Sequence, residues 1–147
     1  MKLIAISENP EENDSFLDNP SAKTGVEMTV EFYKSVGYAP PWIGYLVEEE
    51  GNLVGFAGFK GPPKDGTIEI AYATEEIFRN QGKGTGICRL LVEMARMADP
   101  NVKITARTLP ESNFSTKILG KNGFVFSGTV TDPEDGEVWE WVLKGGF

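Results

Sequence analysis

Residues 78–86 read FRNQGKGTG and carry glycine at three alternate positions, immediately before the apolar run ICRLLVEMARMA at residues 87–98. In that run large apolar side chains recur every three to four residues, which predicts an amphipathic helix. A glycine-rich turn at a helix start exposes backbone N–H groups, because the first helical amides lack partners inside the helix and the helix dipole is positive there. The stretch therefore predicts either a site for an anion such as phosphate, or a loop that needs glycine only for close strand-to-helix packing.

Two phosphate-binding motifs fit this spacing poorly. A P-loop needs Lys followed directly by Ser or Thr, whereas Lys83 is followed by Gly84. In a dinucleotide fingerprint the third glycine comes one position later, and an acidic residue closes the next strand, where this chain has Arg107. A P-loop is excluded, and a dinucleotide-dependent oxidoreductase remains only as a weaker alternative.

The composition narrows the chemistry further. The 147 residues include 14 Lys and Arg against 22 Asp and Glu, and the net charge of −8 disfavours nucleic acid and anionic lipid as partners. The chain has no histidine, which excludes Ser-His-Asp and Cys-His catalysis and argues against a transition-metal site. The single cysteine, Cys88, lies in the apolar run and indicates a small buried side chain, so we expect no metal and no disulfide.

The length and the hydropathy pattern favour one domain over residues 1–147. The start of the chain turns acidic within eight residues, and no uncharged apolar run is long enough for a membrane span. We expect a cytoplasmic protein that is a monomer or a homodimer and binds neither membrane nor nucleic acid.

The order of the expected elements is β, α, α, β, β, β, α, β, α, β, β, which predicts an α/β (α+β) fold with a mixed, mostly antiparallel sheet and helices on both faces. The strands are expected at residues 2–7, in a hairpin within 42–61, and at 67–74, 101–108, 124–132 and 137–143. The longer helices are expected at residues 21–36, 87–98 and 110–123.

Two segments carry a family resemblance. Residues 79–84, RNQGKG, resemble the Q/R-x-x-G-x-G/A signature of the GCN5-related N-acetyltransferases (GNAT). Residues 113–124, NFSTKILGKNGF, resemble the downstream pattern of Asn, Ser or Thr, Leu and Gly-Phe in the subgroup that includes ribosomal-protein N-acetyltransferases. The resemblance covers the chain from Thr67 onward and implies the acyl-CoA N-acyltransferase (GNAT) fold, with transfer of an acetyl group from acetyl-CoA to a primary amine of a protein N-terminus or a small molecule.

The resemblance also implies a cofactor site. The backbone amides of residues 81–86 would hold the pyrophosphate of coenzyme A at the helix start, with Arg79 and Lys83 as cationic side chains. The pantetheine arm would pair along the strand end, and Asn113 would contact that arm, although Asn113 is equally well placed to cap a helix. The full set of expected cofactor-binding residues is Tyr72, Ala73, Thr74, Arg79, Gln81, Gly82, Lys83, Gly84, Thr85, Gly86 and Asn113.

The catalytic groups are less clearly indicated. An amine must lose a proton, and Glu69 on the strand that enters the site is the first choice of base, ahead of Glu75 and Glu76. Many family members place a tyrosine in the second-motif helix to protonate the leaving thiolate, but this helix has none. Thr116 or Ser115 is expected in its place, unless solvent supplies the proton.

The acceptor is expected to contact residues 8–45 and the last hairpin. Aromatic side chains supply surface there, namely Phe32, Tyr33, Tyr38, Trp42, Trp139 and Trp141. The alternative function is a noncatalytic acyl-CoA-binding module that keeps the loop and lacks the acid–base groups.

Overall fold

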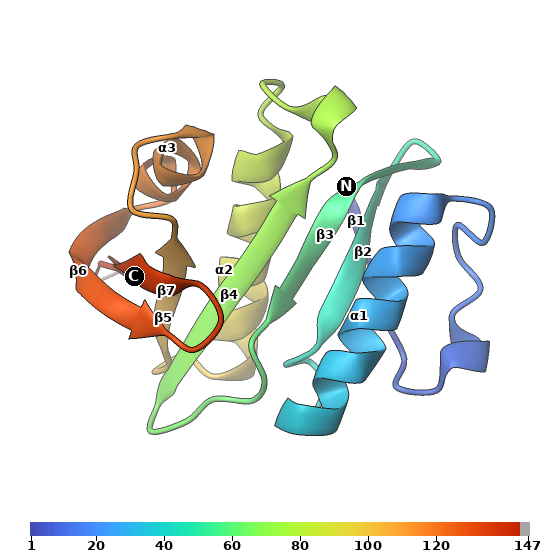
Figure 1. The fold of residues 1–147 in the computed structure, drawn as a ribbon, viewed down its shortest axis with the longest axis horizontal. Helices are drawn as coiled ribbons and strands as arrows, with labels where there is room; N and C mark the ends of the chain where they lie inside the picture. Colours follow the sequence, from blue (N-terminus) through green and yellow to red (C-terminus); the bar gives the residue numbers. More distant parts are fainter. Residues whose placement is uncertain (145–147) are drawn as a thin grey trace.

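The computed structural model describes residues 1–144 and contains seven strands, three α-helices and two short 3₁₀ helices (Figure 1). Their order along the chain is β1 (Lys2–Ala5), η1 (Pro10–Glu12), α1 (Pro20–Val36), β2 (Gly44–Glu49), β3 (Asn52–Phe59), β4 (Thr67–Thr74), η2 (Glu76–Phe78), α2 (Lys83–Ala98), β5 (Lys103–Thr108), α3 (Phe114–Lys121), β6 (Phe124–Asp132) and β7 (Gly136–Leu143).

The strands form one sheet in the order β1-β2-β3-β4-β5-β7-β6, in which only β4 and β5 run parallel. Helix α1 covers one face, where Gly25 lies directly against the ring of Phe56 on β3. Helix α2 covers the other face, where Ile87 lies beside Gly55 of the same strand (Figure 1). This arrangement confirms the predicted mixed, mostly antiparallel sheet with helices on both faces.

Strands β4 and β5 separate part-way along their length. Their pairing ends at Ile70 and Ala106, although β4 continues to Thr74 (Figure 1). On its other side β4 stays paired with β3, and the backbone of Glu69 and of Glu75 bonds in that direction. Because backbone groups alternate between the two sides of a strand, Tyr72 and Thr74 direct their N–H and C=O groups toward the side that β5 has left. The end of β4 therefore has unpaired backbone groups on the side of β5, which makes it an open edge in the middle of the sheet.

Several details differ from the sequence predictions. Helix α2 begins at Lys83 instead of residue 87, and α3 spans only Phe114–Lys121 instead of residues 110–123. The first strand ends at Ala5, because the side chain of Asn13 accepts from Ser7 N (2.7 Å), donates to Ser7 O (3.0 Å) and draws the chain out of the sheet. Tyr33, expected among the surface aromatics, is only 7% exposed, and its hydroxyl donates to Ile6 O at 2.9 Å.

Cys88 is fully buried under the sheet, as predicted. Within residues 1–144, no helix combines the length and the apolar character that crossing a membrane requires.

Candidate functional site

The glycine loop ends in a sharp left-handed turn at the start of α2. Gly82 is the N-cap residue with φ +79°, and Asn80 before it has φ +64°. The amides of Lys83, Gly84 and Thr85 are the first of the helix and have no intrahelical acceptor. The amide of Gly86 donates to Gly82 O at 3.2 Å and is therefore not among the available donors. The loop thus presents a shorter row of N–H groups than the sequence predicted.

A small pocket of about 260 Å³ opens at this helix end and is rich in positive charge. Arg79, Lys117 and Lys121 line it, and no carboxylate does among the residues that the structure describes. Arg79 is held in place because its Nε donates to Thr74 O at 3.3 Å and its guanidinium lies 4.9 Å from the centre of the Phe114 ring. In a chain with a net charge of −8, this local excess of cations indicates an anion site.

Two of the predicted loop side chains point elsewhere. The ammonium of Lys83 pairs with Glu49 at the end of β2 and holds the pKa of that carboxyl below its usual value. The side-chain amide of Gln81 donates to Ile77 O at 3.1 Å. Lys117 and Lys121 of α3 supply the charge that was expected from Lys83. Their four-residue spacing on the helix face that also carries Phe114 was the available signal in the sequence.

Gly84 has a packing role besides its place in the loop. A Cβ atom added there would lie 2.5 Å from Ile118 Cδ1 on α3 and 3.1 Å from Thr74 Oγ1 on β4. Glycine therefore lets the start of α2 approach both elements, which is the packing role that the sequence left open beside anion binding.

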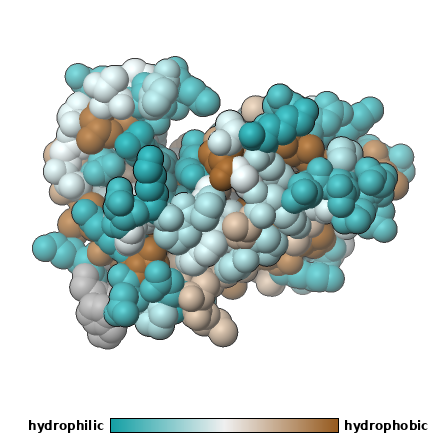
Figure 2. Space-filling view, turned by 90° about the horizontal axis from the view of Figure 1, so that it is seen from below, coloured by the Kyte–Doolittle hydropathy of each residue, from teal (hydrophilic) through white to brown (hydrophobic). Residues whose placement is uncertain are grey.

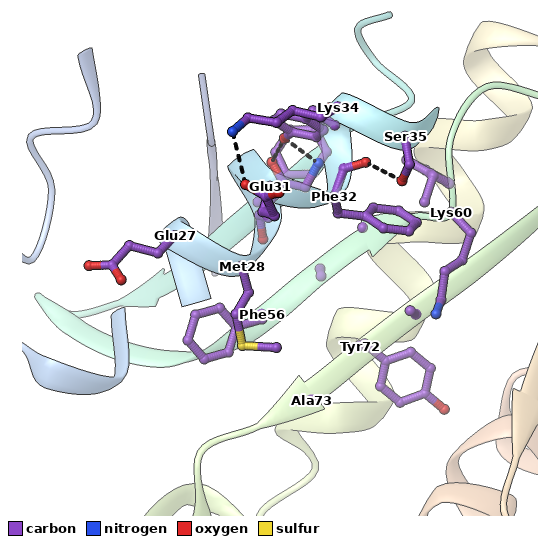
Figure 3. Close-up of a pocket in the computed structure, with 18 of the residues that line it drawn as sticks. Glu27, Met28, Glu31, Phe32, Lys34, Ser35, Phe56, Lys60, Tyr72 and Ala73 are labelled. Atoms are coloured by element: carbon purple, nitrogen blue, oxygen red, sulfur yellow. Dashed lines mark hydrogen bonds and ion pairs between the residues drawn. The ribbon is translucent and has the colours of Figure 1, made fainter. Parts of the chain in front are cut away.

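A larger groove of about 970 Å³ lies on the opposite face of the sheet, under α1. Met28 and Phe32 of α1, Phe56 of β3 and Ala73 of β4 are among its lining residues (Figure 3). Glu134, in the turn between β6 and β7, closes its far side. Figure 2 shows the surface hollowed between the two halves of the molecule, with hydrophilic side chains on both rims.

The open edge of β4 joins the two hollows. Tyr72 and Ala73 line the groove, whereas Thr74, the next residue, lines the cationic pocket. Burial raises the pKa of the Tyr72 hydroxyl well above its ordinary value, so this side chain stays neutral. A long molecule with an anionic group in the pocket can therefore run along β4 and reach the groove.

Glu69 lies on the same face of β4 as Ala71 and Ala73, just beyond the end of the groove. Its Oε1 is 3.7 Å from Nε of Arg107 on β5. Burial raises the pKa of Glu69, and the nearby positive charges of Arg107 and Lys60 oppose that shift. Of the alternative bases, Glu75 accepts a hydrogen bond from Ser21 at 3.0 Å.

The polar residues at the start of α3 serve the helix itself. The side-chain oxygen of Asn113 accepts from the amides of Ser115 (2.8 Å) and Thr116 (3.2 Å). The Thr116 hydroxyl donates to Asn113 O at 2.9 Å and accepts from Asn113 N at 3.1 Å. Neither Ser115 nor Thr116 lines the groove or the pocket. Glu69 does not line either hollow, but it lies on β4, whose later residues do, whereas Ser115 and Thr116 lie on neither β4 nor the walls of the hollows.

The predicted aromatic residues divide between groove and packing. Phe32 and Tyr33 both line the groove. Trp42 packs edge-on against Phe59, and both Trp139 and Trp141 pack against Phe126.

Comparison with known proteins identifies the family. A model of the acetyltransferase (GNAT) domain matches residues 3–125. The chain belongs to the GNAT family. This confirms the resemblance found in residues 79–84 and 113–124, and the two hollows can now be described as parts of a GNAT domain.

Relatives of this GNAT domain are distant. The protein named uncharacterized N-acetyltransferase YjdG, from Bacillus subtilis (strain 168), is 30% identical over 104 residues, which span 70% of this chain and 60% of that protein's length. A structure of aminoglycoside acetyltransferase AAC(6')-Ib in complex with coenzyme A is 27% identical, with a TM-score of 0.59, and the match covers 68% of this chain and 64% of that one. A ribosomal-protein-alanine N-acetyltransferase from Brucella melitensis is 19% identical, with a TM-score of 0.65 and coverage of 97% and 98%, and shares the fold.

Proposed function

We propose that this GNAT domain is an acetyl-CoA-dependent N-acetyltransferase that transfers an acetyl group to a primary amine by direct attack on the thioester. The observation that carries the proposal is the open edge of β4, which leads from a cationic pocket at a helix start to a groove on the other face of the sheet. This route suits a cosubstrate with phosphates at one end and a reactive thioester at the other.

The residues present fit coenzyme A. The amides at the start of α2 and the side chains of Arg79, Lys117 and Lys121 would bind the pyrophosphate by charge-assisted hydrogen bonds. The Tyr72 C=O and the Thr74 N–H would pair with the amides of the pantetheine arm, as a neighbouring strand does, which leaves the Tyr72 N–H for the thioester. Asn113 would contribute through its amide nitrogen, since the helix cap uses only its oxygen.

Glu69 is the base that we propose for the amine. Glu69 lies three positions before Tyr72 on β4, a Cα separation of about 10 Å at 3.3 Å per residue, so it would accept the proton through a chain of water molecules. The amine nitrogen attacks the thioester carbon, the carbon–sulfur bond breaks, and the sulfur leaves as a thiolate. A backbone N–H at the open edge, that of Tyr72, would stabilise the negative charge on the carbonyl oxygen.

The leaving thiolate needs no dedicated acid. A thiol has an ordinary pKa of about 8.5, so solvent protonates it readily near neutral pH. We therefore propose solvent in place of Thr116 and Ser115, because the Thr116 hydroxyl is engaged in the helix cap.

The second candidate function is an acyl-CoA-binding module without catalysis. It is favoured by the absence of tyrosine from α3 and by the capping role of Thr116. In either case we propose a cytoplasmic monomer or homodimer that binds neither nucleic acid nor membrane.

Ligand-induced stabilisation tests the cofactor assignment. Coenzyme A at about 100 times its Kd is expected to stabilise the protein by about 2.7 kcal/mol, which raises Tm by several degrees, whereas NADH and NADPH leave it unchanged. The double variant K117E/K121E is expected to weaken binding at least about tenfold through loss of two charge-assisted contacts. K23E/K103E, which makes the same change of charge at two exposed positions outside the pocket, is the control.

Release of thiol from acetyl-CoA across a panel of small amines, polyamines and N-terminal peptides tests catalysis. We expect turnover with at least one acceptor and its loss in E69Q. Tight binding of coenzyme A with no turnover on any amine would favour the binding module. Stabilisation by NADH but not by coenzyme A would refute the proposal.

A further inference from the structure

Arg107 lies at the centre of a charged cluster built from four strands. Its guanidinium on β5 faces Glu69 of β4, Asp132 at the end of β6 and Glu140 of β7. The Asp132 contact is the shortest, with Nη1 donating to Oδ2 at 3.0 Å, whereas Nε is 3.7 Å from Glu69 and 3.6 Å from Glu140. The Nε atom is buried and donates no hydrogen bond within the described residues. The single positive charge of Arg107 therefore interacts with three carboxylates.

Asp132 also holds the turn at the tip of the last hairpin. Its Oδ1 accepts from Glu134 N at 2.9 Å and from Asp135 N at 3.2 Å, while its Oδ2 takes the bond from Arg107. The same turn bends toward β4 and places Glu134 at the groove (Figure 1). Arg107 therefore contacts Glu69, which we assign as the base, and is linked through Asp132 to the turn that carries Glu134 at the larger groove.

We propose that Arg107 is a positioning residue for Glu69, and that Asp132 on the hairpin tip competes with Glu69 for its guanidinium. This inference rests on the proposed role of Glu69 as the base. It assigns a second function to the last hairpin besides lining the groove. The position of the hairpin tip determines how closely the Arg107 guanidinium can interact with Glu69.

The electrostatic consequences follow from these contacts. The charged groups that face Glu69 lie on the elements around β4. They are Lys60 after β3, Arg107 on β5, Asp132 on β6 and Glu140 on β7. Burial raises the pKa of Glu69, Arg107 and Lys60 oppose this, and Asp132 and Glu140 add to it. The turn amides, with Arg107, hold the pKa of Asp132 below its usual value. Asp132 therefore stays charged and bound to Arg107, and Glu69 remains a better proton acceptor than an ordinary carboxylate.

The test is a carbon-detected NMR titration of the free protein labelled with ¹³C at glutamate carboxyls, with the Glu69 signal assigned by its loss in E69Q. R107Q is expected to raise the Glu69 midpoint by roughly half a pH unit or more, and R107K to restore most of the wild-type value. D132N is expected to lower the midpoint, because the guanidinium is released to Glu69. In the R107Q background the effect of D132N should fall to less than half.

The control is E137Q, which removes a carboxylate from the same hairpin at an exposed position. It is expected to leave the Glu69 midpoint unchanged. An R107Q midpoint equal to that of the wild type, or equal shifts from D132N in both backgrounds, would overturn the competition. D132N keeps Arg107 in place and so provides the reading if R107Q does not fold.

The titration needs no acceptor, so its result is separate from the test of the enzymatic function. With an active amine from the panel, the acid limb of the kcat/KM profile, which reports the free enzyme, should move with the NMR midpoint in D132N, while KM for acetyl-CoA stays the same. If D132N instead raises KM for acetyl-CoA and leaves the acid limb at its wild-type position, the cluster only supports the fold. That outcome would contradict the proposal.

Discussion

At the scale of single residues, Tyr33 joins three elements through one hydroxyl. It lies on α1, donates to Ile6 O next to β1 at 2.9 Å, and accepts from Gly44 N of β2 at 2.8 Å. Burial raises the pKa of this tyrosine to about 12, so the hydroxyl stays protonated and able to donate. The helix above the groove is thereby attached to the sheet at a fixed depth.

Replacing Tyr33 by Phe is expected to lower the free energy of unfolding by roughly 1–3 kcal/mol, because Gly44 N and Ile6 O lose their partner inside the protein. Urea denaturation measures the difference. Tyr38→Phe is the control, since the Tyr38 ring stacks edge-on against Tyr33 at 5.1 Å and keeps that contact without its hydroxyl. Equal stability of the two variants would contradict the assigned role of the Tyr33 hydroxyl.

The same residues mark how far sequence reasoning reaches at this scale. Apolar spacing placed Tyr33 on a helix, but its hydroxyl bonds depend on where two strands run beneath that helix. The sequence likewise placed Lys83 in the loop, whereas the direction of its side chain is decided by Glu49, which is distant in the chain. Residue type and local spacing thus predict the backbone of the site well. They do not predict side-chain partners that are remote in sequence.

At the scale of elements, the open edge of β4 makes a pattern that hydrogen exchange detects. The amides of Ala71 and Ala73 bond to β3 and are expected to be protected, whereas those of Tyr72 and Thr74 should exchange at least about 100-fold faster. Within β4, acetyl-CoA is expected to slow the exchange of Tyr72 and Thr74 only, and the amides at the start of α2 should slow with them.

Strand β3 provides the internal control for this measurement, because it has a partner strand on each side and all its central amides should be protected. Uniform protection along β4 without ligand would show that its edge is closed in solution.

The elements themselves were largely predictable. Glycine density marked the start of α2 within a few residues, and the Asn113 cap and Gly123 bounded α3. The separation of β4 from β5 was not predictable, because β5 follows only after the intervening helix α2 and no local pattern encodes the register between the two strands. The lysines of α3 were missed for a related reason. They line the cationic pocket only because α3 packs against the glycine loop, and that contact cannot be read from local sequence.

At the scale of the whole molecule, β4 and β5 share only four residue pairs, as β5 and β7 do, yet one core extends across the sheet at this joint. The buried cluster includes Leu46 of β2, Ala106 of β5 and Leu119 of α3. Calorimetry is expected to give a single unfolding transition with a ratio of calorimetric to van't Hoff enthalpy of about one. This also tests the prediction of one domain, and two resolved transitions would divide the chain at that joint.

The contact between Gly84 and Ile118 spans the same joint from the side of the helices, and it makes the two positions epistatic. A methyl group at position 84 requires space that the Ile118 side chain occupies. Gly84→Ala alone requires the end of the Ile118 side chain to move aside, whereas Ile118→Ala made first leaves room for the new methyl group. If Gly84→Ala weakens the protein, a genetic screen for its suppressors should therefore return smaller residues at position 118, on a helix that lies well beyond the loop in the chain.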